Sequence, residues 1–185
     1  VVYLHDRFPK LQDNIIGDDF LRMDLTTIFD GQPFVLTGNY PYDISSQIFF
    51  KMLDNKELIP CCTGMIQKEV AERIAEKPGT KTYGILSVLL QAWYDIEYLF
   101  TVGSGAFAPP PKVQSAVIRL RRNSRADLGC DPALFKEIVK MSFNQRRKTL
   151  RNSLRQLCTR HPEVDVADKV SDLRPERLSV EDFIE

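Results

Sequence analysis

Residues 35–47 organise the chain, and they read Val35-Leu36-Thr37-Gly38-Asn39-Tyr40-Pro41-Tyr42-Asp43-Ile44-Ser45-Ser46-Gln47. The apolar start is typical of a short buried strand, and a tight turn with an amide, a proline and two aromatic rings follows. Gly38 lets the backbone turn where a Cβ would obstruct it, and Pro41 fixes its own φ and keeps Tyr40 extended. Asp43 is a good helix N-cap. A strand, a rigid aromatic turn and a helix mark the place where an open α/β sheet binds its ligand.

The turn carries groups that suit an amino group on a flat ring. The side-chain oxygen of Asn39 and the carbonyl of Tyr40 can both accept hydrogen bonds from one NH₂ group, and Tyr42 can lie flat against the ring. Turn chemistry alone fits an ordinary strand, turn and helix with packed tyrosines equally well. In either case a helix follows, because one helical face collects the apolar residues Ile44, Ile48, Phe49, Met52 and Leu53.

Four motifs of the chain resemble those of one enzyme family. Asn39-Tyr40-Pro41-Tyr42 looks like the Asn/Asp-Pro-Pro-Tyr-type motif of S-adenosylmethionine-dependent amino-methyltransferases. Three further segments follow in the order found in the KsgA-type ribosomal RNA adenine dimethyltransferases: Gln67–Arg73, Gly105–Val117 and Phe143–Arg151. The four motifs span most of the chain, so the resemblance is specific.

The resemblance implies an α/β fold, with a Rossmann-like class I methyltransferase sheet and a small C-terminal all-helical domain. We expect a partial catalytic domain over residues 1–122 and a helical RNA-binding domain over residues 123–185. The Gly-rich turn and the later acidic residue that open such a sheet are absent from the printed sequence. We therefore infer that the N-terminal strands are missing, that about half of the cofactor pocket is lost with them, and that this chain is weak or inactive.

The same resemblance assigns the catalytic and cofactor residues. Asn39, Tyr40, Pro41 and Tyr42 form the catalytic turn. Asp19, followed by Phe20, falls where these enzymes place an acidic residue for the adenine amino group of S-adenosylmethionine, and Asn39 also faces this cofactor. The sequence around Asp19 fits a solvated acidic turn as well, which is the commoner fate of paired aspartates.

A further aromatic residue is assigned to the substrate. The resemblance places Phe107 against the target base, opposite Tyr42, whereas the residues alone favour a core phenylalanine held by the prolines 109–111. Two departures from the family pattern affect this region. Ser104 stands where the family usually has proline, and Asp43 stands where it usually has asparagine.

The formal net charge of zero hides an uneven distribution. Residues 1–118 carry 10 Lys and Arg against 14 Asp and Glu, residues 119–160 carry 12 against 3, and residues 161–185 carry 3 against 8. A basic block between two acidic ones is a candidate nucleic-acid face.

Within the basic block, Arg147, Arg151 and Arg155 recur four residues apart on one helical face, with Arg146 and Lys148 beside them. A charged helix face is usually only solvated. Because no acidic residue lies between these cations, we predict phosphate contacts, and we name Arg147, Lys148 and Arg151 as substrate-binding residues.

Hydrophobic periodicity predicts the remaining elements. Strands are expected over residues 14–21, 58–67, 97–102 and 114–121, and helices over residues 69–76 and 83–93. A polar linker over residues 122–129 precedes a purely helical region. A capping box that begins at Ser179 marks a last helix.

The composition bounds the class of protein. A chain of 185 residues suits one full domain and a small second one. No apolar run approaches the ~20 residues of a membrane helix, and no signal peptide is visible, so we expect a cytoplasmic protein without a membrane partner. The cysteines lack metal-ligand spacing and the two histidines stand alone, so no metal is expected.

The implied activity is N6-dimethylation of two adjacent adenines in a hairpin near the 3′ end of small-subunit (16S) ribosomal RNA. The methyl donor is S-adenosylmethionine, and the partner is an immature 30S particle bound by a monomer. Two alternatives stay open. One is a large-subunit RNA methyltransferase of the antibiotic-resistance type, and the other is a ribosome-assembly factor whose catalysis is secondary.

Overall fold

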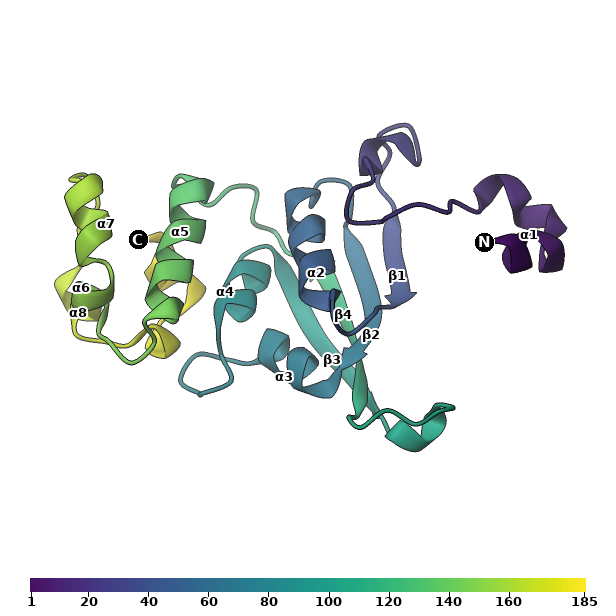
Figure 1. The fold of residues 1–185 in the computed structure, drawn as a ribbon. Coiled ribbons are helices and arrows are strands. Elements are labelled where there is room, and N and C mark those ends of the chain that lie inside the picture. The colour runs from purple at the N-terminus through teal and green to yellow at the C-terminus, as the bar shows by residue number, and fades with distance from the viewer.

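The structure is a computed structural model that describes all residues from Val1 to Glu185. A central sheet carries helices against it, and a group of helices forms the C-terminal end (Figure 1). The elements in order are α1 (Val2–Arg7), η1 (Pro9–Asn14), η2 (Leu25–Thr27), β1 (Val35–Asn39), α2 (Ser45–Asp54), β2 (Cys61–Gln67), α3 (Lys68–Ala75), α4 (Ile85–Gln91), β3 (Tyr94–Val102), η3 (Ser104–Ala106), β4 (Ser115–Arg122), α5 (Pro132–Asn144), α6 (Leu150–Ser153), α7 (Arg155–Arg160), α8 (Asp168–Ser171), η4 (Pro175–Arg177) and α9 (Val180–Ile184).

The four strands form one mixed sheet in the order β1-β2-β4-β3. β1 and β2 are parallel, as expected for a strand–helix–strand unit through α2. β4 lies between β2 and β3 and is antiparallel to both. Therefore β1, β2 and β3 all end, and β4 begins, at the same edge of the sheet, which we call the site edge.

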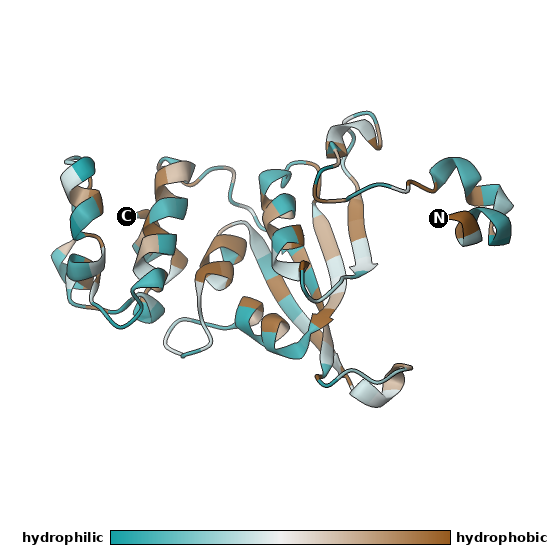
Figure 2. Ribbon diagram, in the orientation of Figure 1, coloured by the Kyte–Doolittle hydropathy of each residue, from teal (hydrophilic) through white to brown (hydrophobic).

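One face of the sheet is buried and the other is open. Alternate strand residues point to opposite faces, and Cys62, Ile66, Ile118 and Leu120 are fully buried on the face that the helices cover. On the other face, 61% of Val35 is exposed. Apolar residues gather on α4 and on the strands, which Figure 2 shows in brown. The prediction of an α/β sheet is confirmed.

The C-terminal helices pack on the sheet part through α5. The ring of Phe143 contacts the rings of Tyr83 and Phe183, each with a centroid separation of 6.0 Å. Arg146 donates hydrogen bonds to the carbonyl oxygens of Tyr83 (2.6 Å) and Thr80 (3.3 Å). Arg146 therefore holds the two parts of the chain together and is not available as the phosphate-binding neighbour that the sequence suggested.

The connection from β4 to α5 is anchored rather than loose. Arg122 donates to the carbonyl oxygen of Trp93 (2.8 Å) and Arg125 to that of Ala92 (2.9 Å). Arg125 also pairs with Glu181 at 2.6 Å. The predicted linker thus lies in the expected place, but two other parts of the chain, residues 92–93 and α9, fix its course.

The strand predicted over residues 14–21 is wrong. These residues form a 3₁₀ turn and irregular backbone, and Ile16 is 56% exposed. A strand needs a partner, and β1 pairs only with β2. Instead, Lys51 of α2 donates to the carbonyl oxygens of Leu21 (3.2 Å) and Met23 and holds this segment against the helix.

The predicted cap at Asp43 is also wrong. α2 begins at Ser45, its N-cap is Ile44, and no side chain caps it. The turn is one residue longer than expected, because the amide of Ile44 donates to the carbonyl of Pro41 and the hydroxyl of Ser45 donates to that of Tyr42. The apolar face of α2 is as predicted, with Ile48, Phe49 and Met52 among the buried residues.

The expected continuous helix through the arginines is interrupted. α5 ends at Asn144, residues 145–149 form a turn, and α6 begins at Leu150. The turn is closed by a hydrogen bond from the amide of Lys148 to the carbonyl of Gln145 (2.7 Å). Arg147 therefore lies on a turn and not on the helical face of Arg151 and Arg155.

The strand expected after residue 34 is present as β1, but it is an exposed edge strand and not a buried one, because it has a neighbour on one side only. The positions of the other predicted strands and helices agree with the structure. The strands over residues 58–67, 97–102 and 114–121 correspond to β2, β3 and β4, and the helices over residues 69–76 and 83–93 to α3 and α4. The capping box at Ser179 is present with Asp182. No helix combines the length and the apolar character required to cross a membrane.

Candidate functional site

The motif residues 39–42 leave the sheet at the site edge. Asn39 is the last residue of β1, and the amide of Tyr40 continues the ladder with a hydrogen bond to the carbonyl of Met65 (3.0 Å). Tyr40 is buried, whereas Asn39 and Pro41 are exposed and Tyr42 is half-buried. The motif is therefore not enclosed, and its polar groups are open to a ligand.

The ring of Tyr40 lies in a slot between two glycines on neighbouring strands. Gly38 and Gly64 are paired in the β1–β2 register. A Cβ at Gly38 would lie 2.8 Å from Cε1 of Tyr40, and a Cβ at Gly64 would lie 2.3 Å from Cε2. The sequence predicted that a Cβ at Gly38 would be obstructed. The obstacle is this ring, not a turn of the backbone.

The hydroxyl of Tyr40 lies 3.1 Å from the Sγ of Cys62. Burial raises the pKa of Tyr40 far above its ordinary value, and it raises the pKa of the Cys62 thiol to about 12. Both groups are therefore neutral at physiological pH, so neither serves as a base or a nucleophile. Their contact fixes Tyr40, and with it the position of the Tyr40 carbonyl.

Two acceptors at the motif have no partner within the protein. The side chain of Asn39 makes no hydrogen bond, and neither does the carbonyl of Tyr40, although the neighbouring carbonyls of Pro41 and Tyr42 are both engaged. These are the two groups that the sequence analysis assigned to an amino group. Two free acceptors on adjacent residues, of which Asn39 is exposed, are suited to an external donor.

Tyr42 is held at both ends. Its carbonyl accepts a hydrogen bond from the Ser45 hydroxyl (3.2 Å), and its own hydroxyl is 2.5 Å from the Oγ of Ser115. Ser115 is the first residue of β4 and is fully buried. The sequence analysis missed both serines. Ser45 bonds locally and could have been found as a serine near the helix start, whereas Ser115 gives no signal of a partner 73 residues away.

Phe107 is in the connection between β3 and β4, which leaves and re-enters the sheet at the site edge (Figure 1). It follows the short η3 turn, and its side chain is half-buried. The backbone amide of Lys68 donates to the carbonyl of Gln114 (2.9 Å) and ties the end of this connection to β2 and α3. The structure thus places Phe107 and Tyr42 on segments that start at the same edge.

Asp19 and Phe20 are not brought to the motif. The Asp19 carboxylate accepts from the amide of Leu21 (3.0 Å) and lies 3.4 Å from the guanidinium of Arg22. Lys51, in the last turns of α2, anchors this segment, whereas the motif precedes the first turn of that helix. An exposed carboxylate beside an aromatic ring has the chemistry to accept an adenine amino group, so the residues fit the adenine end of the cofactor only.

The basic block is largely paired within the protein. Arg119, Arg122, Arg125, Lys136, Arg146, Arg151 and Arg160 all form ion pairs. The pair of Arg151 with Asp172 is long, at 3.7 Å, and 62% of the Arg151 side chain is exposed. Arg147, Lys148 and Arg155 are exposed and have no ion pair, so they remain free for phosphate groups.

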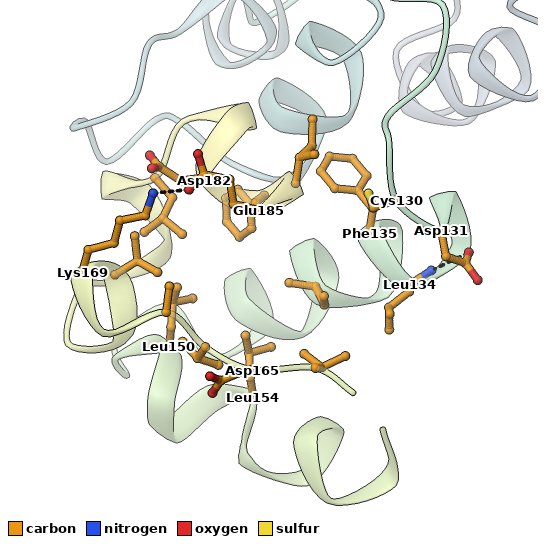
Figure 3. A pocket seen from close by; sticks show the side chains of 18 of the residues that line it. Cys130, Asp131, Leu134, Phe135, Leu150, Leu154, Asp165, Lys169, Asp182 and Glu185 are labelled. Carbon is orange, nitrogen blue, oxygen red and sulfur yellow. Dashed lines mark hydrogen bonds and ion pairs between the residues drawn. The ribbon is translucent and has the colours of Figure 1, made fainter. Parts of the chain in front are cut away.

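A pocket elsewhere is apolar and does not involve the motif. It has a volume of about 260 Å³ and lies among the C-terminal helices (Figure 3). Leu134, Phe135, Leu150 and Leu154 line it, and an ion pair between Lys169 and Glu185 lies at its margin. Thirteen of its 19 lining residues are hydrophobic, so it belongs to the packing of the helices.

The chain matches known proteins over its whole length. A family model described as ribosomal RNA adenine dimethylase matches residues 5–182. A relative from Bacteroides fragilis is 67% identical over 184 residues, one from Porphyromonas gingivalis is 58% identical and one from Cytophaga hutchinsonii is 52% identical, and each is named "Ribosomal RNA small subunit methyltransferase A". All of this chain is covered, together with 67%, 71% and 70% of the respective relatives.

Solved structures agree with the fold. A dimethyladenosine transferase from Plasmodium falciparum aligns with a TM-score of 0.73 and 23% identity, over 91% of this chain and 69% of that one. The 23S rRNA methyltransferase ErmE aligns with a TM-score of 0.62 and 24% identity, over 99% of this chain and 75% of that one.

The four-stranded sheet and its helices define an α/β protein with the fold of these two aligned structures. The chain belongs to the ribosomal RNA adenine dimethylase family. It spans about two thirds of the length of the Bacteroides fragilis relative.

Proposed function

We propose that the protein dimethylates N6 of two adjacent adenines in a hairpin near the 3′ end of small-subunit ribosomal RNA, within an immature 30S particle. Residues 1–122 contribute to the catalytic domain, and residues 123–185 bind RNA as a helical domain. The observation that carries the proposal is the pair of unpartnered acceptors, Asn39 and Tyr40, beside Tyr42 at the open site edge.

The residues of the motif act on the adenine. The lone pair of the N6 amine is delocalised into the ring, so the amine attacks poorly while it is planar. Hydrogen bonds from N6–H to the Asn39 oxygen and the Tyr40 carbonyl favour a pyramidal nitrogen and stabilise the positive charge that develops there. S-adenosylmethionine, when bound, supplies the electrophilic methyl group, and Asp19 and Phe20 are the residues of this chain with the chemistry for its adenine.

The base must leave its stack to reach the motif, and Tyr42 and Phe107 would hold it between their rings. No general base is required before transfer, because the ammonium product is acidic and loses its proton readily. A site without a histidine is consistent with this chemistry. Arg147, Lys148 and Arg151 contact the RNA phosphates and position the hairpin without reading its sequence.

The test replaces Asn39 by alanine in the protein as the cell makes it. Removing one preorganised partner of the developing charge lowers the rate of transfer about 10²–10³-fold. RNA affinity stays nearly unchanged, because the phosphate contacts lie elsewhere. Methyl incorporation is measured with immature small subunits and, for comparison, with large-subunit RNA. Asn14→Ala is the control variant, because Asn14 is an exposed asparagine outside the motif.

The outcomes separate the candidate functions. Turnover of Asn39→Ala at the unsubstituted rate removes Asn39 from the mechanism. Transfer to large-subunit RNA in preference to small subunits supports the antibiotic-resistance type instead. Normal particle assembly by Asn39→Ala in cells would identify RNA binding as the main role.

A further inference from the structure

We propose that Ser115 is a positioning residue for Tyr42, and that it sets the direction in which the Tyr42 ring projects from the site edge toward the target adenine. The inference rests on the proposed function. It extends that function to a residue 73 positions from Tyr42 in the sequence, and it starts from the 2.5 Å contact between the Tyr42 hydroxyl and the Ser115 Oγ.

The contact controls the ring because of where the hydroxyl lies. The hydroxyl oxygen of a tyrosine lies on the long axis of the ring, so a hydrogen bond there fixes the direction of that axis. Without it, the ring of a half-buried residue at a chain turn can exchange between staggered rotamers. The bond from Ser45 to the Tyr42 carbonyl holds the main chain only. Ser115 is therefore the group that selects the orientation of the ring.

Ser115 is itself fixed more firmly than a loop residue would be. It is fully buried and is paired in the sheet with Gln67 on one side and Val102 on the other. Next to it, Gln114 accepts a hydrogen bond from the backbone amide of Lys68 (2.9 Å) and another from the Lys68 ammonium group (3.3 Å). A site residue held by strands is placed more accurately than one held by loops.

The position of Ser115 also relates the two aromatic walls of the site. Ser115 is the first strand residue after the connection that carries Phe107. One buried hydroxyl therefore fixes Tyr42 to the point where the Phe107 segment rejoins the sheet. A base held between the two rings requires that they keep a constant separation, and this bond supplies that constraint.

The experiment measures base stacking separately from chemistry. An RNA hairpin carries 2-aminopurine at the target adenine, because stacking of this base on an aromatic ring quenches its fluorescence. The variants are Ser115→Ala, Ser115→Thr, Tyr42→Phe, Tyr42→Ala and the double variant of Ser115→Ala with Tyr42→Phe, and Ser153→Ala is the matched control. Ser153 is a buried serine whose hydroxyl bonds only to the carbonyl of Leu150 in its own helix.

We expect Ser115→Ala and Tyr42→Phe to raise the fluorescence of the bound probe and to lower kcat about fivefold, the effect of one neutral hydrogen bond. KM and RNA affinity change little, because the phosphate contacts are intact. The double variant is no worse than either single variant, since both remove the same bond. Ser115→Thr keeps a hydroxyl and restores both readouts, and Ser153→Ala behaves like the unsubstituted protein.

Two results would overturn the inference in distinguishable ways. If Tyr42→Ala raises the probe fluorescence but Ser115→Ala and Tyr42→Phe do not, stacking at Tyr42 stands and the role of Ser115 is refuted. If Tyr42→Ala also leaves fluorescence and transfer unchanged, the proposed function fails at this site and the inference fails with it. Tyr42→Phe removes the bond without opening a cavity, so a folding defect in Ser115→Ala does not obscure the answer.

Discussion

Replacing Gly64 by alanine tests whether the slot around Tyr40 is as tight as the structure shows. The added Cβ would lie 2.3 Å from Cε2, 2.8 Å from Cζ and 2.9 Å from Cδ2 of the Tyr40 ring. Ordinary carbon contacts are about 3.5–4.0 Å, so the ring must move by about 1 Å. Gly38 closes the opposite side of the slot, and the ring of Phe49 meets Tyr40 edge-on at 6.0 Å.

The cost follows from these contacts. Overpacking of a closed core site costs about 1–3 kcal/mol, and displacement of the Tyr40 hydroxyl from Cys62 removes a hydrogen bond worth about 1 kcal/mol. We therefore expect Gly64→Ala to lower the free energy of unfolding by about 2–4 kcal/mol. Because the Tyr40 carbonyl moves with its ring, methyl transfer falls as well.

Urea denaturation of the chain measures the loss, and Gly105→Ala is the matched control. A Cβ at Gly105 meets no atom within 4 Å, so the free energy of unfolding of that variant lies within about 0.5 kcal/mol of the value for the unsubstituted chain. Combining Gly64→Ala with Tyr40→Ala should recover part of the loss, since the smaller side chain vacates the slot. The packing argument would be refuted if Gly64→Ala were as stable as its parent. It would also be refuted if the double variant lost the sum of the free energies of unfolding that the two single variants lose.

Two further predictions concern RNA binding and alkaline stability. Arg147→Glu with Arg151→Glu weakens binding to small-subunit particles and lowers the slope of log affinity against log salt by about 0.7–0.9 per lost phosphate contact. Filter binding across salt concentrations measures this slope, and the variant Lys10→Glu with Arg22→Glu is the control. An unchanged slope would refute the assignment of Arg147 and Arg151 to phosphate groups. For Cys62, burial raises the folded pKa to about 12 from an ordinary value of 9. The contribution of the neutral Cys62 thiol to the free energy of unfolding is complete below pH 9. That contribution is lost as pH rises toward 12, and the free energy of unfolding falls by about 1.4 kcal/mol per pH unit above pH 9. Denaturation at pH 8 and 10 should therefore show a smaller pH effect in Cys62→Ala, and an equal effect in both proteins would contradict the assignment.

Much of the sheet and of the motif was predictable, because local patterns specify them. β2, α3, α4 and the last two strands follow hydrophobic periodicity, and the turn after β1 follows from its proline and aromatic residues. The slot around Tyr40 had a weaker signal: an isolated glycine within a strand, such as Gly64, often marks a close approach by another group.

The errors have two physical origins, which are partners far away in the sequence and local turns whose hydrogen bonds interrupt or delay a helix. Residues 14–21 have the composition of a strand, but no strand lies beside them to pair with. Instead, Lys51 of α2 binds the carbonyl of Leu21 and holds the end of this segment against that helix. The sequence was right that Arg151 and Arg155 are helical, but they lie in two short helices, α6 and α7, and a turn closed by Lys148 and Gln145 separates Arg147 from both. The bond from Ser115 to Tyr42 joins the first residue of β4 to the turn after β1, and no local pattern relates these two segments.

The insertion of β4 between β2 and β3 governs when the site can form during synthesis. The motif emerges from the ribosome early, whereas Ser115 and the strand that carries it follow 73 residues after Tyr42. Until that strand enters the sheet, β2 and β3 have no common neighbour. The nascent chain therefore carries its Asn-Tyr-Pro-Tyr turn before Ser115 is present to hold Tyr42, and we expect that contact to form only when β4 pairs with β2 and β3.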